Sequence, residues 1–172
     1  MKRLSIRAAV ISAAVAVLFT PRADATGIND KAPVFQLTDV NGAKAGLKAG
    51  DSGVTLVNFW ASWCGPCAVE FPNLNKLAAE YKAKGVRVLA INIDKDRPSA
   101  DRFLTRYAKD GTTLTVLLDP KGKTAETYGT KAMPTTYMVD GKGVVRFVHV
   151  GFRPEDTEQW RKEIDSLLAA AK

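Results

Sequence analysis

The chain has 172 residues, of which 46% are hydrophobic and 25% are charged. This composition excludes a disordered chain, and the length fits one globular domain with a short appendage. The net charge of +7 comes from basic residues that are scattered rather than clustered with aromatic ones, which excludes the pattern of a nucleic-acid-binding protein.

The first 25 residues have the pattern of a secretory signal peptide. A basic start with Lys2 and Arg3 is followed by an uncharged, mostly apolar run at 8–19 and by Ala23-Asp24-Ala25, an A-x-A-like cleavage site. The apolar run is shorter than a comfortable membrane span, so we expect cleavage after Ala25 rather than a retained anchor. Cleavage removes four of the 25 basic residues and one of the 18 acidic ones, which leaves 21 against 17 and a net charge of +4.

The exported part is predicted to begin with a short lead and a β-hairpin. Residues 26–30 are expected to form a mobile lead, and 32–38 have the apolar pattern of a strand. The segment 39–42 is a turn signal, and the small, polar stretch 43–53 is predicted to form a loop or a loose second strand.

The only two cysteines of the chain, Cys64 and Cys67, lie at a predicted strand-to-helix turn. The apolar, partly β-branched run 54–60 predicts a strand, and apolar residues at helical spacing predict a helix from about 66 to 84. Pro66 suits the first helical position, because its missing N–H is not needed there. Cys64 therefore falls about at the helix N-terminus, where free N–H groups and the helix dipole favour a thiolate. A thiolate attacks disulfides, and a second thiol one turn away resolves the mixed disulfide.

A purely structural role is the first alternative for the cysteine pair. A disulfide between Cys64 and Cys67 closes a loop so short that loop entropy makes it worth only about 2 kcal/mol. A zinc site is the second alternative, but the chain has no other cysteine and a single histidine, His149. Four nitrogen or sulfur ligands therefore cannot be assembled without carboxylates. We expect a redox-active pair, with no metal and no other cofactor.

The remaining elements alternate strands with helices. The run 86–93 is nearly continuously apolar and predicts a strand buried on both faces, parallel to 54–60 in a right-handed βαβ unit. The further elements are a helix at 98–109, a strand at 114–118, a short helix at 124–128, strands at 135–139 and 144–150, and a last helix opening at Pro154. The pattern predicts one α/β domain whose mixed sheet is covered by helices.

Several of these segments resemble the thioredoxin superfamily, and within it the TlpA/ResA-like exported thiol-disulfide reductases. The resemblance rests on Trp63-Cys64-Gly65-Pro66-Cys67, on Ala32-Pro33-x-Phe35-x-Leu37 followed by Asn41-Gly42, on Glu70-Phe71-Pro72, and on Met133-Pro134-Thr135-Thr136. A helix and a strand inserted before Met133 distinguish this branch from a minimal thioredoxin. The resemblance implies a thioredoxin-like α/β fold over 26–172, with a mixed central sheet, flanking helices, an N-terminal β-hairpin and the central helix-strand insertion.

The resemblance also implies roles for residues around the cysteines. Pro134 is implied to follow a cis peptide bond and to lie against the cysteine pair, with the Met133 backbone free to pair with an extended substrate. An ordinary trans turn before a strand is the alternative. Trp63, Gly65 and Pro66 are implied to contact the substrate as well.

One position departs from cytoplasmic thioredoxin. The strand acid that accepts the proton of the second thiol there corresponds to Asn58, whose amide takes no proton at ordinary pH. Glu70 is the candidate replacement, because it lies three residues after Cys67 and so on the same side of the helix. Partial burial would raise its pKa toward neutrality. The alternative is a solvent-facing acid of the first turn, favoured by the helix dipole.

Other prominent residues are expected to have no part in the chemistry. Trp60 is predicted to belong to the core. His149 is predicted to be structural or on the surface, because the sequence shows no partner for it. Residues 94–97 are expected to form a solvated loop.

Together these features predict an exported thiol-disulfide oxidoreductase that reduces disulfides of substrate proteins. The resemblance implies a membrane thiol donor that re-reduces the protein, and substrates in cytochrome c or copper-site maturation. The closest alternative is a protein oxidant, although Gly65-Pro66 is typical of reducing thioredoxins. A peroxidase and a non-catalytic thioredoxin-like binding module are further alternatives. We expect a monomer that binds no nucleic acid.

Overall fold

The computed structural model describes residues 25–109 and 111–171, so the predicted signal peptide falls almost wholly outside the described part. Helices and strands alternate along the chain, as predicted. In chain order they are β1 (Phe35–Asp39), β2 (Lys44–Leu47), β3 (Thr55–Trp60), α1 (Gly65–Tyr81), the 3-10 turn η1 (Lys82–Lys84), β4 (Arg87–Asn92), α2 (Arg97–Tyr107), β5 (Thr115–Leu118), α3 (Lys123–Thr127), β6 (Thr135–Val139), β7 (Val145–Val150) and α4 (Asp156–Ala170).

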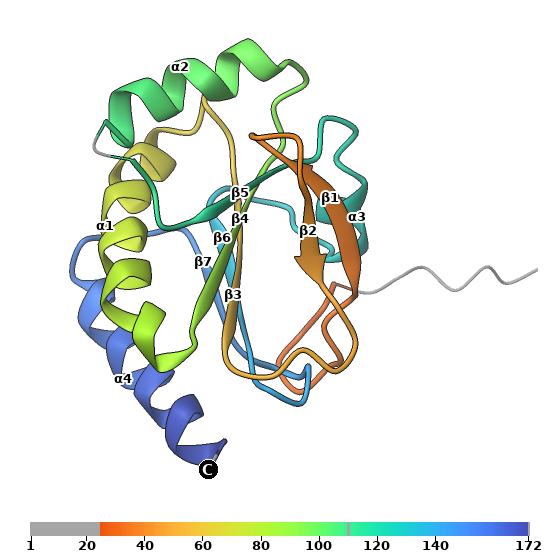
Figure 1. Ribbon diagram of the computed structural model, residues 1–172, viewed down its shortest axis with the longest axis vertical. Coiled ribbons are helices and arrows are strands. Elements are labelled where there is room, and N and C mark those ends of the chain that lie inside the picture. The colour runs from red at the N-terminus through yellow and green to blue at the C-terminus, as the bar shows by residue number, and fades with distance from the viewer. Residues whose placement is uncertain (1–24, 110, 172) are drawn as a thin grey trace, which may run out of the picture.

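The strands form one mixed sheet in the order β2-β1-β5-β4-β3-β6-β7. β3, β4 and β5 run parallel to one another, and the other neighbouring strands pair antiparallel. The βαβ unit formed by β3, α1 and β4 is confirmed, as is the N-terminal hairpin of β1 and β2. The parallel strands end at the same edge of the sheet, where α1 and α2 begin (Figure 1).

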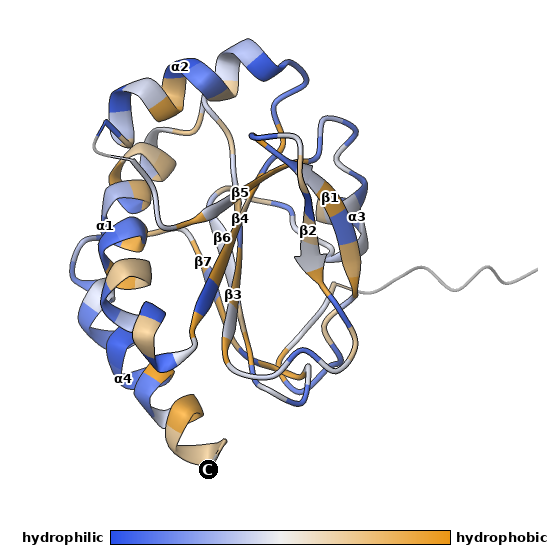
Figure 2. Cartoon of the chain, in the orientation of Figure 1, coloured by the Kyte–Doolittle hydropathy of each residue, from blue (hydrophilic) through white to orange (hydrophobic). Residues whose placement is uncertain are grey.

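Helices cover both faces of the sheet and divide the core in two. α1, α2 and α4 lie on one face, whereas α3 and the β1-β2 hairpin lie on the other side of the central strands (Figure 1). Side chains of β3 alternate between the two: Leu56 and Trp60 join the α1 core, and Val57 and Phe59 join the α3 core. In Figure 2 the hydrophobic colouring follows the central strands, and hydrophilic residues colour much of α2. Trp60 is fully buried, as predicted.

The segment expected to be a mobile lead is instead fixed to the body of the domain. The backbone N–H of Thr26 donates to the Tyr128 carbonyl at 3.1 Å, and that of Asn29 donates to the Val145 carbonyl at 2.8 Å. Val145 in turn donates its N–H to the Asp30 carbonyl at 2.9 Å. The prediction was wrong because these bonds join residues more than 100 positions apart, which no local pattern records.

The last helix begins two residues later than predicted. The Asp156 carboxylate accepts a hydrogen bond from the Arg153 backbone N–H at 2.8 Å and holds the preceding residues in a turn. Asp156 and Glu158 are therefore the acids of the first helical turn, where they suit the helix dipole. Among the described residues, none of the helices combines the length and apolar character needed to cross a membrane.

Candidate active site around the cysteine pair

The cysteine pair lies where β3 passes into α1. The backbone N–H of Cys64 donates to the Ala61 carbonyl at 3.2 Å, which closes a tight turn directly after the strand. Cys64 is then the N-cap residue of α1, in extended conformation, and its Sγ accepts a hydrogen bond from the Cys67 N–H at 3.2 Å. This bond satisfies one of the free N–H groups at the helix start. The two cysteines form a disulfide, with their Cα atoms 5.3 Å apart.

The two sulfur-bearing residues differ in their access to solvent. Cys67 has no exposed surface and Cys64 retains 5% of its own. Around them Trp63 is 71% exposed, and Gly65 and Pro66 are also on the surface. An incoming sulfur atom therefore meets Cys64 first, beside an exposed aromatic ring.

A buried acid lies beneath the pair, on the same side of α1 as Cys67. The Glu70 carboxylate accepts hydrogen bonds from Asn58 Nδ2 at 2.9 Å and from Thr136 Oγ1 at 3.2 Å. Asn58 Nδ2 also donates to Thr136 Oγ1 at 2.9 Å. Glu70 is 1% exposed, so the burial on which a raised pKa depends is present and the solvent-facing alternative is wrong.

Burial dominates the acidity of Glu70. Loss of solvent raises its pKa to about 8, although the hydrogen bonds from Asn58 and Thr136 pull in the opposite direction by favouring the carboxylate. The thiol of an ordinary cysteine has a pKa of about 8.5. Glu70 therefore titrates close to the pH range in which an ordinary thiol loses its proton.

Asn58 keeps one polar atom without a partner. Within the described residues its Oδ1 is buried and accepts no hydrogen bond. The same side-chain amide binds Glu70 through its nitrogen, so the open acceptor lies next to a carboxyl group that is largely protonated at pH 7. Buried polar atoms without partners are uncommon in proteins.

The turn that carries Trp63 is held by a second buried acid, which the sequence did not reveal. Asp94 accepts hydrogen bonds from the Ser62 N–H and the Ser62 hydroxyl, each at 3.0 Å, and from Asn92 Nδ2 at 2.8 Å. It is 6% exposed, so the prediction of a solvated loop is wrong for this residue. The position of Asp94 two residues beyond the apolar β4, at the edge where α1 begins, is the signal that could have revealed it.

The segment before β6 completes the site. Strand register pairs Phe59 with Thr135, so Pro134 lies beside the end of β3, next to the cysteine turn. The Met133–Pro134 peptide bond is cis, and half-buried Met133 packs against the core cluster that includes both cysteines. The structure thus brings together the residues that the sequence singled out: Trp63, Cys64, Gly65, Pro66, Cys67, Glu70, Met133 and Pro134.

His149 has a partner after all. Its Nε2 lies 2.6 Å from the Glu163 carboxylate of α4, and its ring packs against Trp160 with the ring centres 5.2 Å apart. The prediction that His149 is structural or on the surface is confirmed, and its partner could not be seen in the sequence because Glu163 lies on another element. The described part of the chain holds no cluster of three or more His, Cys, Asp or Glu side chains suited to a metal ion.

Comparisons with known proteins agree with this site. Residues 28–168 match the Redoxin family. The thiol-disulfide oxidoreductase ResA of Geobacillus kaustophilus is 30% identical over 171 residues, which cover 95% of this chain and 97% of that protein. The thioredoxin-like protein YneN of Bacillus subtilis is 35% identical over 78% of each chain. A solved structure from Chlorobium tepidum, assigned provisionally as the thiol:disulfide interchange protein DsbE, is 42% identical and superposes with a TM-score of 0.77 over 84% of this chain and 99% of that one.

Proposed function

This chain belongs to the Redoxin family as a ResA-like thiol-disulfide oxidoreductase, and from that membership we propose that it is exported and reduces disulfides of substrate proteins. The observation that carries the proposal is the asymmetry of the pair. Of the two cysteines only Cys64 retains exposed surface, and Cys67 is enclosed on the side of α1 that also carries Glu70, an acid whose pKa is about 8. One thiol is thus arranged to attack and the other to resolve.

The reaction proceeds in two exchanges, starting from the dithiol. The Cys64 thiolate attacks one sulfur of the substrate disulfide, so that a mixed disulfide forms and a substrate thiolate leaves. The ionised fraction of Glu70, which grows as pH approaches 8, accepts the proton of Cys67, and Cys67 then attacks Cys64 Sγ and releases the second substrate thiolate. Two electrons pass to the substrate, and the protein ends with the Cys64–Cys67 disulfide seen in the structure.

The surroundings of Cys64 support its role as the attacking thiol. Its Sγ already accepts the Cys67 N–H at the start of α1, and the same bond stabilises a thiolate more than a thiol. Trp63 and the segment of Met133 and Pro134 flank the sulfur and are proposed to bind the substrate chain. Gly65 and Pro66, exposed between the cysteines, leave the approach to Cys64 open.

The direction of electron flow and the partners follow from the same proposal. An exported dithiol that acts as a reductant requires a membrane thiol donor, because its surroundings are oxidising. Resemblance to the TlpA/ResA-like reductases supports a substrate in cytochrome c or copper-site maturation. Gly65-Pro66 between the cysteines favours the reductase over the protein oxidant.

The reduction potential of the Cys64–Cys67 couple tests the direction. Equilibration of the mature chain with glutathione or dithiothreitol buffers is expected to give a value near that of thioredoxin, about −270 mV. A value near that of a strong oxidant, about −120 mV, would instead assign the protein to disulfide donation. The Cys64→Ser variant serves as the control, since it cannot form the couple.

A further inference from the structure

A polar groove opens beside the turn that carries the cysteine pair. Its volume is about 250 Å³, and α2 supplies most of its wall. We call it the arginine groove; it is lined by Ser62, Ser99, Arg102, Phe103, Arg106 and Tyr107. Ser62 belongs to the cysteine turn and stands two residues before Cys64, so the groove begins within about 7 Å of the attacking residue.

The two arginines of the groove have no carboxylate partner in the part of the chain that the structure describes. Arg102 and Arg106 are four residues apart, so they lie on one side of α2, and both are exposed. Neither forms an ion pair with a carboxylate among residues 25–109 and 111–171. Arg102 donates only to the Ser99 hydroxyl, at 2.9 Å, and Arg106 lies over the Tyr107 ring.

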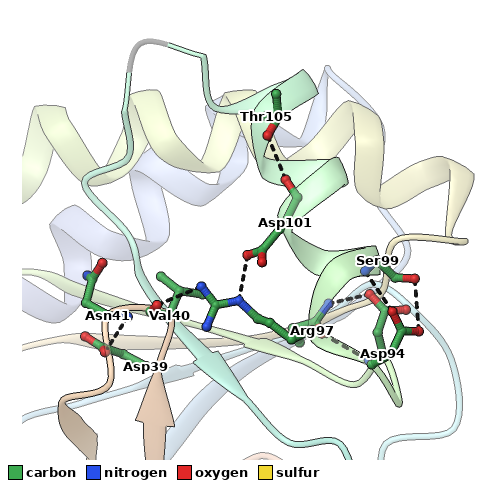
Figure 3. Close-up of polar contacts among 10 residues, drawn as sticks. Asp39, Val40, Asn41, Asp94, Arg97, Ser99, Asp101 and Thr105 are labelled. Atoms are coloured by element: carbon green, nitrogen blue, oxygen red, sulfur yellow. Dashed lines mark hydrogen bonds and ion pairs between the residues drawn. The ribbon is translucent and has the colours of Figure 1, made fainter.

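The third arginine of α2 shows the contrast. Arg97 donates to the Asp101 carboxylate at 2.6 Å and to the Val40 carbonyl at 2.7 Å, so it joins α2 to the β1-β2 hairpin (Figure 3). The positive charge of Arg97 is therefore paired with a carboxylate within the fold. Asp101 is the acid within α2, and it pairs with Arg97 rather than with Arg102 or Arg106.

The other wall of the groove is fixed and polar. The Ser62 hydroxyl and backbone N–H are both held by Asp94, which keeps the turn in place beside α2. The neighbouring residue Trp63 projects its ring into solvent at 71% exposure. An exposed aromatic ring and two exposed guanidinium groups, which form no ion pair among the described residues, therefore lie near the turn that carries Cys64.

We propose that the arginine groove binds an acidic segment of the substrate polypeptide next to its disulfide; this assignment rests on the function proposed above. Guanidinium groups bind carboxylates with paired, charge-assisted hydrogen bonds. Opposite charges at such a site also raise the rate of productive encounter, and salt weakens this effect. The groove thus selects among disulfide substrates by the acids that accompany the disulfide.

The test compares two synthetic peptides that contain the same intramolecular disulfide. One peptide carries a run of glutamates beside the disulfide, and the other carries glutamines in the same places. Each peptide is made in two versions, with the run before the cysteines in one and after them in the other. The mature, reduced chain is mixed with each peptide, and the second-order rate constant of disulfide reduction is measured. The variant Arg102→Gln/Arg106→Gln is compared with Lys82→Gln/Lys162→Gln, which removes two exposed charges elsewhere.

The unaltered protein is expected to reduce the glutamate peptide about three to ten times faster than the glutamine peptide, as two exposed ion pairs allow. The arginine variant is expected to lose this preference and the lysine variant to keep it. The preference is also expected to shrink at about 0.5 M salt. Circular dichroism confirms that both variants are folded.

Three results would overturn the groove assignment while leaving the reductase intact. The first is equal rates for both peptides in the unaltered protein. The second is a preference for the glutamate peptide that survives in Arg102→Gln/Arg106→Gln. The third is binding to phosphatidylglycerol vesicles that this variant alone loses, which would assign the arginines to a membrane surface. If the reduced protein reduces neither peptide, the proposed function itself is overturned.

Discussion

The amide of Asn58 and the carboxyl group of Glu70 are joined by a hydrogen bond of 2.9 Å in a site closed to solvent. Asn58 comes from the middle of β3, and Glu70 comes from the second turn of α1. Their contact buries an acid with a raised pKa three residues along α1 from Cys67, and no cation among the described residues pairs with it. Glu70 gives two testable predictions, and Asp94, Trp63 and the leader give one each.

The stability of the oxidised protein is expected to fall as pH rises through the titration of Glu70. The carboxyl group has a pKa of about 8 in the folded chain and about 4.5 when unfolded, so the folded state binds the extra proton between these values. The stabilisation is complete below about pH 4.5 and is lost as pH rises toward 8, by up to about 1.4 kcal/mol per pH unit. Urea unfolding of the wild type and of Glu70→Gln across this range measures the difference; parallel curves would contradict the raised pKa.

Glu70→Gln is also expected to slow the resolving step. Loss of a positioned proton acceptor typically costs about 100-fold or more in such a step, whereas formation of the mixed disulfide at Cys64 is expected to change far less. Rapid-mixing kinetics of the reduced protein with a disulfide peptide separate the two phases. Glu126→Gln, an exposed acid on α3, is the control. A resolving phase of unchanged rate and pH profile would exclude Glu70 as the proton acceptor.

Asp94→Ala is expected to destabilise the fold by about 2–3 kcal/mol. The substitution leaves the Ser62 N–H, the Ser62 hydroxyl and the Asn92 amide without their acceptor, and unpaired buried donors are costly. Lys95→Ala, at the exposed neighbouring position, is expected to change stability by less than about 0.5 kcal/mol. Equal urea midpoints for the two variants would show that the Asp94 bonds contribute no net stability.

Trp63→Ala is expected to separate stability from substrate recognition. The ring is 71% exposed, so its loss should change the free energy of unfolding by less than about 0.5 kcal/mol. Reduction of a protein disulfide is expected to slow several-fold, because exposed aromatic side chains contribute strongly to binding surfaces. Val34→Ala, which removes another exposed apolar side chain, is the matched control. Equal turnover of insulin by both variants would remove Trp63 from the binding surface.

Export is expected to remove residues 1–25. When the full chain is expressed in a bacterium, the intact mass of the secreted protein should correspond to a chain that starts at Thr26. A bulky residue in place of Ala23 and Ala25 should block this processing, since the cleavage site requires small side chains. Full-length protein in the exported fraction of the unaltered chain would instead indicate an uncleaved leader.

Local patterns made most of the fold predictable. The apolar runs 54–60 and 86–93 and the helix that follows Cys64 have strong periodicity, and their boundaries agree with β3, β4 and α1 within a few residues. The burial of Glu70 could also be inferred, because its spacing from Cys67 is helical and the corresponding side of α1 faces the sheet.

Contacts between distant elements could not be predicted in the same way. Asp94 belongs to a run of charged residues that resembles a surface loop, and only the parallel arrangement of β3 and β4 brings it to Ser62. The pairing of His149 with Glu163 depends on how α4 packs on β7. The hydrogen bond from the Thr136 hydroxyl to Glu70 depends on the register between β3 and β6. Each of these contacts is a property of the assembled sheet.

The hydrogen bond that fixes Thr26 bears on the order of leader cleavage and folding. Its N–H is bound to the Tyr128 carbonyl, and Ala25 lies close against the backbone of Gly129. A processing protease needs several residues on each side of the scissile bond in extended, accessible form, and the proposed bond between Ala25 and Thr26 has folded structure immediately on one side. If the leader is cleaved after Ala25, as the sequence predicts, we expect cleavage to precede folding of the domain, and a precursor that folds first to be a poor substrate for the protease.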